Sequence, residues 1–180
     1  MNSIASTVNN EDATNYSRFL SYGTAAHYNN DGQQLMDAGL RYYLRDWKDH
    51  LNQDDYDYVL NYVRNITEDV TNDKILVLHG RGGGNRSEGL VGEIIDWIGR
   101  VNVMLVDDLD VVTFTTIVKM EQKLVVDDTR EYHCTTRHQR HLKAFHSTGN
   151  KSVIINVLDP EDLSDDFLSV CRVVTINNID

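Results

Sequence analysis

The sequence predicts an α/β fold, in which helices cover both faces of a parallel β-sheet and a helical segment precedes the sheet. Two observations support this class. Before residue 73, apolar residues recur at the spacing of amphipathic helices. After residue 73, short apolar runs alternate with helical patterns. Such alternation is typical of parallel strands, because each connection must cross back to the other end of the sheet.

The helical segment is expected over residues 16–72, after a polar, flexible arm at residues 1–15. One helical pattern covers residues 31–51. A second begins near Asn52 or Asp54, either of which can cap a helix. Its apolar positions repeat at helical spacing, namely Tyr56, Val59, Leu60, Val63, Ile66 and Val70.

The α/β domain is expected over residues 73–180. Its first strand, at 75–78, runs into a glycine-rich turn and then a helix at 87–98. Further apolar runs predict strands at 101–106, 152–157 and 171–176. The segment from 113 to 124 is predicted to be helical or mixed.

The glycine-rich turn is the most informative stretch of the chain. A strand, a glycine-rich turn and a helix start together form a phosphate cradle, because backbone N–H groups point at the anion. Two residues depart from the phosphate-loop pattern G-x-x-x-x-G-K-[ST], since Asn85 replaces the last glycine and Arg86 replaces the lysine. We expect the nucleotide phosphates to contact Gly80, Gly82, Gly83, Gly84, Asn85, Arg86 and Ser87.

Two acids follow the second predicted strand. In phosphate-loop enzymes an acid at the end of a neighbouring strand holds Mg²⁺, and a following acid can orient water. Asp107 and Asp108 have this position and type. Ser87 and Asp107 are therefore the candidate magnesium ligands, and Asp108 is a candidate catalytic residue. The alternative is that both acids are solvated residues at a strand end.

Two further candidates accompany the last two strands. Asn156, near the end of a buried run, can sense a γ-phosphate or position water. Arg172, at the start of the final strand, can stabilise transition-state charge in a neighbouring subunit. The alternatives are purely structural: Asn156 caps a strand end, and Arg172 pairs with Asp165 or Asp166.

Taken in order, these motifs resemble the ATPase core of superfamily III helicases, especially the poxvirus-type and phage-type primase-helicases. The resemblance covers residues 74–176. It implies an AAA+-like phosphate-loop fold, ATP and Mg²⁺ as cofactors, and a ring-shaped homo-oligomer. It also implies that Asp128 and Arg130 precede a hairpin, that Asn156 is the sensor and that Arg172 is the arginine finger.

The departures from the family pattern shape the functional prediction. Arginine does not replace lysine at a tight phosphate site, and Glu88 adds negative charge there. Only residues 88–106 separate Ser87 from Asp107, fewer than the family usually has. We expect a degenerate helicase-like protein of a virus or mobile element, linked to DNA replication, with ATP binding weak or lost. The alternatives are a non-catalytic viral accessory or assembly protein and, less well supported, a nucleotide kinase.

A basic stretch lies within residues 130–146. By the same resemblance it forms a pore hairpin that grips single-stranded DNA or RNA through its phosphates. The candidate contacts are Arg137, His138, Arg140, His141 and Lys143. One alternative is an exposed basic loop that offsets nearby acids. Another is a zinc site, although His133, Cys134, His138 and His141 fit no common ligand spacing.

The composition limits the remaining choices. The formal net charge of −11 argues against nucleic-acid binding by the surface as a whole, so any such contact must be local. No apolar run is long enough to span a bilayer, and no membrane partner is expected. Two cysteines make no disulfide framework, which favours a reducing, intracellular compartment, the cytoplasm or nucleus of a host cell.

Overall fold

The structure is a computed structural model that describes residues 30–80, 86–106, 121–128, 134–147 and 151–177. The chain divides into two compact units, Met1–Asp46 and Trp47–Asp180. In the first unit, α2 spans Asn30–Tyr43, and the predicted arm at 1–15 lies outside the described residues. Residues 47–72, which the sequence pattern groups with the N-terminal segment, belong to the same unit as the sheet.

The second unit alternates strands and helices, as predicted. The short helix η1 (Arg45–Asp49) leads into it, and α3 (Gln53–Thr67) precedes the first strand. The elements that follow are β1 (Ile75–Gly80), α4 (Arg86–Ile98), η2 (Arg100–Asn102), β2 (Val103–Val106), β3 (Leu124–Asp128), α6 (Thr136–Ser147), β4 (Ser152–Val157), η4 (Pro160–Asp162), α7 (Asp165–Leu168) and β5 (Cys171–Ile176).

The five strands form one parallel sheet in the order β2-β3-β4-β1-β5. This confirms the predicted α/β class. The chain leaves the interior strand β1 for the far edge, returns through β3 and β4 to the side of β1, and then places β5 on its other side. β1 is therefore the point at which the strand order reverses, where open α/β sheets bind ligands beyond their carboxyl ends.

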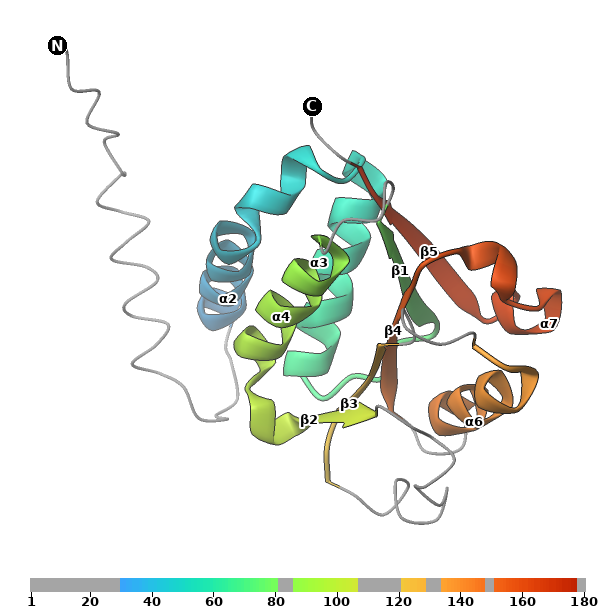
Figure 1. Ribbon diagram of the computed structural model, residues 1–180. Helices are drawn as coiled ribbons and strands as arrows, with labels where there is room; N and C mark the ends of the chain where they lie inside the picture. Colours follow the sequence, from blue (N-terminus) through green and yellow to red (C-terminus); the bar gives the residue numbers. More distant parts are fainter. Residues whose placement is uncertain (1–29, 81–85, 107–120, 129–133, 148–150, 178–180) are drawn as a thin grey trace, which may run out of the picture. The chain divides into compact units, whose positions relative to one another are not determined.

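Helices cover both faces of this sheet (Figure 1). α3 and α4 lie together on one face, and α6 and α7 lie on the other. Because strand side chains alternate between faces, the odd-numbered residues of β1, β3 and β4 pack with α6 and α7. They form one cluster with Leu142, Phe145 and Phe167. All four apolar residues that begin β1 are fully buried, as expected for a strand covered on both sides.

The helix α3 begins and ends with recognisable caps. Asn52, one of the two predicted candidates, is the N-cap, and its side chain accepts a hydrogen bond from the Asp55 N–H at 2.8 Å. At the other end the N–H groups of Asp69 and Val70 donate to the Ile66 and Asn65 carbonyls. Asp69 has a φ of 62°, the left-handed conformation that usually ends a helix with glycine.

Two sequence predictions for this unit were wrong. Leu124, predicted at the end of a helical or mixed segment, begins the strand β3. The strand β3 has only three apolar residues followed by two acids. So short a run cannot be told from the ambiguous pattern that precedes it. Residues 136–147 form the helix α6, and no hairpin is present among residues 134–147. The buried residues Gln139, Leu142 and Phe145 recur every third position, and this periodicity was overlooked beneath the basic residues.

Candidate functional site at the carboxyl edge of the sheet

The glycine-rich turn joins the end of β1 to the start of α4. Gly80 is the last residue of β1, and Ser87 lies in the first turn of α4, where it is buried. The turn residues Gly82, Gly83, Gly84 and Asn85 lie outside the described residues, as does the side chain of Arg86. The elements on either side match the predicted order of strand, turn and helix, and α4 directs its unsatisfied N–H groups toward this edge.

Asn156 occupies the strand beside β1. It is buried and pairs in register with Leu78. Neighbouring strands are about 5 Å apart, so Asn156 lies one strand spacing from β1. Val153, Ile155 and Val157 face α6. Asn156 therefore points to the opposite face, on which α4 packs against β1 and β4. The structure thus brings Asn156 and Ser87 to the same face.

The strand β3 also ends in two acids, which sequence reasoning did not select as magnesium ligands. Asp127 and Asp128 end β3, two strands from β1 and about 10 Å away. Asp107 and Asp108 follow β2, which is three strands from β1, and they lie outside the described residues. Each acid pair follows a short apolar run, residues 124–126 in one case and 103–106 in the other, so the local pattern did not separate them. The sheet order favours the pair in β3.

Of the two acids of β3, the structure describes the side chain of Asp127 and the backbone register of Asp128. Asp127 is only 1% exposed and faces α6, where its Oδ2 atom is 2.5 Å from Nε2 of His138. A buried carboxylate needs such a partner, because leaving it unpaired is costly. Asp128 is the next residue, and its backbone pairs in register with Asn156. Asp127 is therefore engaged on the face away from α4, and Asp128 is the acid aligned with Asn156.

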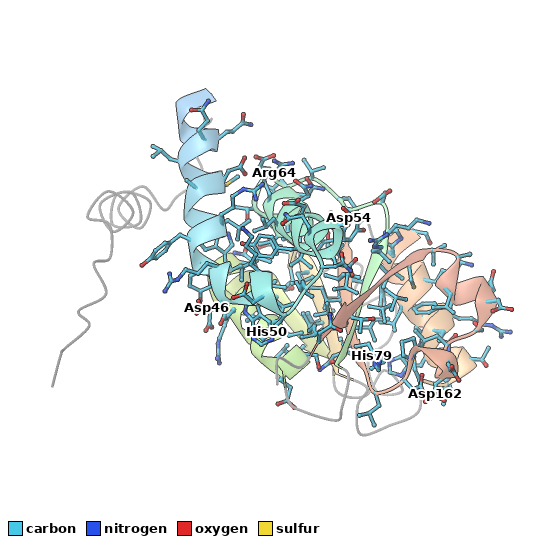
Figure 2. All side chains as sticks on the ribbon, turned by 90° about the horizontal axis from the view of Figure 1, so that it is seen from above. Asp46, His50, Asp54, Arg64, His79 and Asp162 are labelled. Atoms are coloured by element: carbon cyan, nitrogen blue, oxygen red, sulfur yellow. The ribbon has the colours of Figure 1, made fainter. Side chains whose placement is uncertain are left out.

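His79 lies at the carboxyl end of β1, directly before the glycine-rich turn (Figure 2). Its Nδ1 atom is buried and makes no hydrogen bond within the described part of the chain. A buried ring nitrogen in this state is unusual, since most buried polar atoms are paired. Sequence reasoning ended the strand at Leu78 and did not select His79 as a site residue.

Arg172 lies far from this edge. It is the second residue of β5 and pairs in register with Leu76, four residues before the end of β1. Its Nη2 atom is 2.7 Å from Oδ1 of the buried Asp55, and its guanidinium lies 5.5 Å from the centre of the Tyr58 ring. This pairing joins β5 to the start of α3. The guanidinium is thus held near the amino edge of the sheet, and its partner is Asp55 rather than Asp165 or Asp166.

The five predicted nucleic-acid contacts lie on α6 and have different environments. His138 is held by Asp127, and Lys143 is 2.9 Å from Asp166. Arg137 and Arg140 are exposed, and His141 is half-buried. Two of the five side chains therefore face acids of this chain, and the arginines are the residues that remain at the surface.

The structure offers little support for a zinc site. His133 lies outside the described residues, and the described residues contain no group of three or more histidine, cysteine or acidic side chains able to hold a metal. Burial raises the pKa of the Cys134 thiol to about 12, with Asp127 adding to the rise. A thiol in this environment stays protonated, whereas zinc binds the thiolate.

Comparisons with known proteins identify no family. No family model matches the chain, and no curated protein is similar to it. Among solved structures the chain is similar to PCH-2 of C. elegans, with 12% identity, a TM-score of 0.41, and 76% of this chain and 46% of that chain covered. Trip13 of Rhizobiales is 13% identical, with a TM-score of 0.43, and the match covers 90% of this chain and 65% of that chain. A HORMA:CdnC:Trip13 complex of E. coli MS115-1 is 10% identical, with a TM-score of 0.39, and the match covers 93% of this chain and 68% of that chain.

The chain spans about half to two-thirds of the length of the PCH-2 and Trip13 chains named first. The functional argument below therefore rests on the sheet and its residues alone. Among the helices that the structure describes, none is long and apolar enough to cross a bilayer.

Proposed function

We propose that this chain is a nucleotide-binding protein of the phosphate-loop class that takes ATP and Mg²⁺ at the carboxyl edge of its sheet. The observation that carries the proposal is the order of polar groups across three adjacent strands. The glycine-rich turn follows β1, Asn156 lies in β4, and Asp128 ends β3. Parallel strands bring these ends to one edge, at the point where the strand order reverses.

Each residue has a role that suits its chemistry. Glycine N–H groups and Arg86 bind the phosphates, and the Ser87 hydroxyl and an acid of β3 are oxygen ligands of the kind that Mg²⁺ prefers. We assign the acid to Asp128, because the Asp127 carboxylate is engaged by His138. When bound, the metal would neutralise charge on the phosphates. Asn156 positions water or the terminal phosphate.

The substitutions in the turn favour weak binding and slow turnover. Arg86 replaces a compact ammonium with a larger planar group. A degenerate superfamily III helicase of a virus or mobile element remains the specific form of the proposal, supported by the order of turn, acid and asparagine along the sequence. An assembly protein without catalysis is the alternative, and it predicts no nucleotide binding.

Isothermal titration of the full chain with Mg-ATP tests the proposal. We expect measurable affinity that falls roughly tenfold or more in Arg86→Ala and in Asp128→Asn, because each loses an interaction with a charged group. Asp107→Asn is the matched control for Asp128→Asn. Comparing the ATP affinities of the two variants shows whether the site uses an acid of β3 or one that follows β2. Arg172→Gln should leave the affinity unchanged. Absence of binding at millimolar ATP would reject the nucleotide site and leave the assembly role.

Contact with single-stranded nucleic acid is a second proposal, supported by the exposed Arg137 and Arg140 of α6. Fluorescence anisotropy with a labelled oligonucleotide should show affinity that decreases with salt. The double variant Arg137→Ala/Arg140→Ala should weaken it and flatten the salt dependence. Equal affinity in the wild type and the variant would exclude α6 as the contact surface.

A further inference from the structure

A hollow of about 210 Å³ lies between α6 and α7, on the face of the sheet that α4 does not cover (Figure 1). Because Asn156 and Ser87 lie on the face of α4, the hollow is separate from the proposed nucleotide site. Three of its residues recur along α6 and form one stripe on that helix. The polar residues of the lining are Thr136, Gln139, Arg140, Lys143, Ser164 and Asp166.

A buried side chain joins the two walls of the hollow. Gln139 of α6 is only 4% exposed, and both ends of its amide are bonded. Its Oε1 atom accepts hydrogen bonds from the Ser164 N–H at 3.0 Å and from the Ser164 hydroxyl at 2.7 Å. Its Nε2 atom donates to the Cys134 carbonyl at 2.7 Å. Buried polar groups that are fully bonded hold their surroundings rigid. A ligand therefore meets a preformed hollow.

The groups that this hollow offers to a ligand are the side chains of Arg140 and Thr136. Both are exposed, so a molecule from solvent can reach them. Neither side chain makes a hydrogen bond or an ion pair within the part of the chain that the structure describes. Residues four apart on a helix have Cβ atoms about 5–6 Å from each other. The guanidinium and the hydroxyl can therefore contact the same small molecule.

A second cation of the hollow, Lys143, is paired with an acid of α7. Its Nζ atom lies 3.0 and 2.9 Å from the two carboxylate oxygens of Asp166. The lysine side chain is 34% exposed and the aspartate side chain 83% exposed. Water screens such a pair, so the pair contributes little and Lys143 can turn to a bound anion. With Arg140 the lining carries two cations and one acid, which favours a negatively charged ligand.

We propose that this hollow binds a phosphate group. The oxygens of a tetrahedral anion point in several directions, so one phosphate meets the Arg140 guanidinium, the Lys143 ammonium and the Thr136 hydroxyl. A planar carboxylate has only two oxygens and cannot meet all three donors at once. The hollow is several times larger than the volume of about 30 Å³ that one water occupies in the liquid. It therefore has room for free phosphate or for the phosphate of a small monoester.

Amide chemical-shift titration of the ¹⁵N-labelled full chain tests the proposal. Inorganic phosphate should shift the amides of residues 136–143 in a saturable way. Methanesulfonate and acetate carry the same single charge, and the tetrahedral sulfonate should bind there roughly threefold to tenfold more tightly. Phenyl phosphate distinguishes the two sources of phosphate, since tighter binding than that of inorganic phosphate indicates a monoester and weaker binding indicates the free ion.

Two arginine variants locate the site. Arg140→Gln should weaken phosphate binding roughly tenfold, because it removes a charged donor. Arg137→Gln is the matched control, since it removes the same charge from an exposed residue of α6 that does not line the hollow. It should change the affinity by less than about twofold. The comparison also separates this hollow from the nucleic-acid surface proposed above, which uses both arginines.

Two further variants test the other donors. Asp166→Asn frees the Lys143 ammonium, so phosphate should bind roughly threefold more tightly. Thr136→Val removes the hydroxyl at nearly constant shape and should reduce the preference for methanesulfonate over acetate. Four results would each overturn the proposal: no saturable shift in residues 136–143, shifts confined to residues 80–87, equal affinity for methanesulfonate and acetate, or equal losses in the two arginine variants.

Discussion

The two edges of the sheet use buried polar residues in different ways. At the amino edge the polar side chains bond to one another and to the backbone. The Tyr62 hydroxyl donates to the Val153 carbonyl at 2.7 Å and accepts from the Val153 N–H at 3.0 Å. The Asn72 amide donates to the Tyr62 carbonyl and to the Ser152 hydroxyl, and it accepts from Asn65. These bonds join α3, the following loop and β4.

At the carboxyl edge the polar residues stand at strand ends and in the first turn of a helix. His79 keeps a buried nitrogen without a hydrogen bond in the described chain. Asp127 is held from one side by a residue of α6. The first set therefore stabilises the fold, and the second lies at the edge where we propose that nucleotide binds. Substitutions at the two edges should therefore have different consequences.

Asn72→Leu should give the largest loss of stability. It removes three hydrogen bonds and leaves the Tyr62 carbonyl and the Ser152 hydroxyl without this donor in a buried setting. We expect the free energy of unfolding to fall by about 3 kcal/mol. Urea unfolding followed by circular dichroism measures it. Asn61→Leu, at an exposed position of α3, should change it by less than about 0.5 kcal/mol.

His138→Ala should destabilise the protein by about 2 kcal/mol, because it leaves a buried carboxylate without its imidazole partner. The double variant His138→Ala/Asp127→Leu should recover most of the loss, since both polar groups are then gone. The same urea titrations give both values. A double variant no more stable than the single one would show that the pair contributes little at this edge.

Alkaline pH should weaken the fold through groups near both edges. Burial raises the pKa of Cys134 and Cys171 from 9.0 to about 12, and that of Tyr58 from 10.0 to about 12. The unfolded chain therefore loses these protons first, so the stability present below about pH 9 declines above it.

Each cysteine should contribute about 1 kcal/mol of that decline between about pH 8 and pH 10. Urea midpoints measured across this range test it. In Cys134→Ala the urea midpoint should fall less steeply with pH, because one titrating group is gone. A profile as steep as that of the wild type would show that Cys134 ionises equally in both states.

The smallest expected effect compares two glycines of α4, the helix that begins at the carboxyl edge. A Cβ at Gly92 meets nothing within 4 Å, so Gly92→Ala should stabilise the protein by about 0.5–1 kcal/mol through helix propensity. A Cβ at Gly89 would lie 3.1 Å from the Trp47 ring, whose Nε1 donates to Glu93. Gly89→Ala should gain less or lose stability. Equal changes in melting temperature for the two variants would show that the Trp47 ring moves aside without cost.

Local patterns were enough to find most of the elements. Apolar periodicity and capping chemistry predict the strands at 75–78, 152–157 and 171–176, the helices α3 and α4, and Asn52 as one of two candidate caps. The strand predicted at 101–106 is shorter, because its first two residues belong to η2. These signals are local, because each depends on residues within one or two turns or on a single strand. The α/β class follows from their alternation.

The tertiary structure decided which of these residues meet. The sheet order places Asp128 in register with Asn156 and puts β2, the strand that Asp107 and Asp108 follow in sequence, at the far edge of the sheet. It also pairs Arg172 with Asp55, which lies 117 residues away in sequence, and His138 with Asp127. Sequence periodicity records which face a residue occupies, whereas the order of strands depends on packing between distant segments. Only the folded chain contains that information.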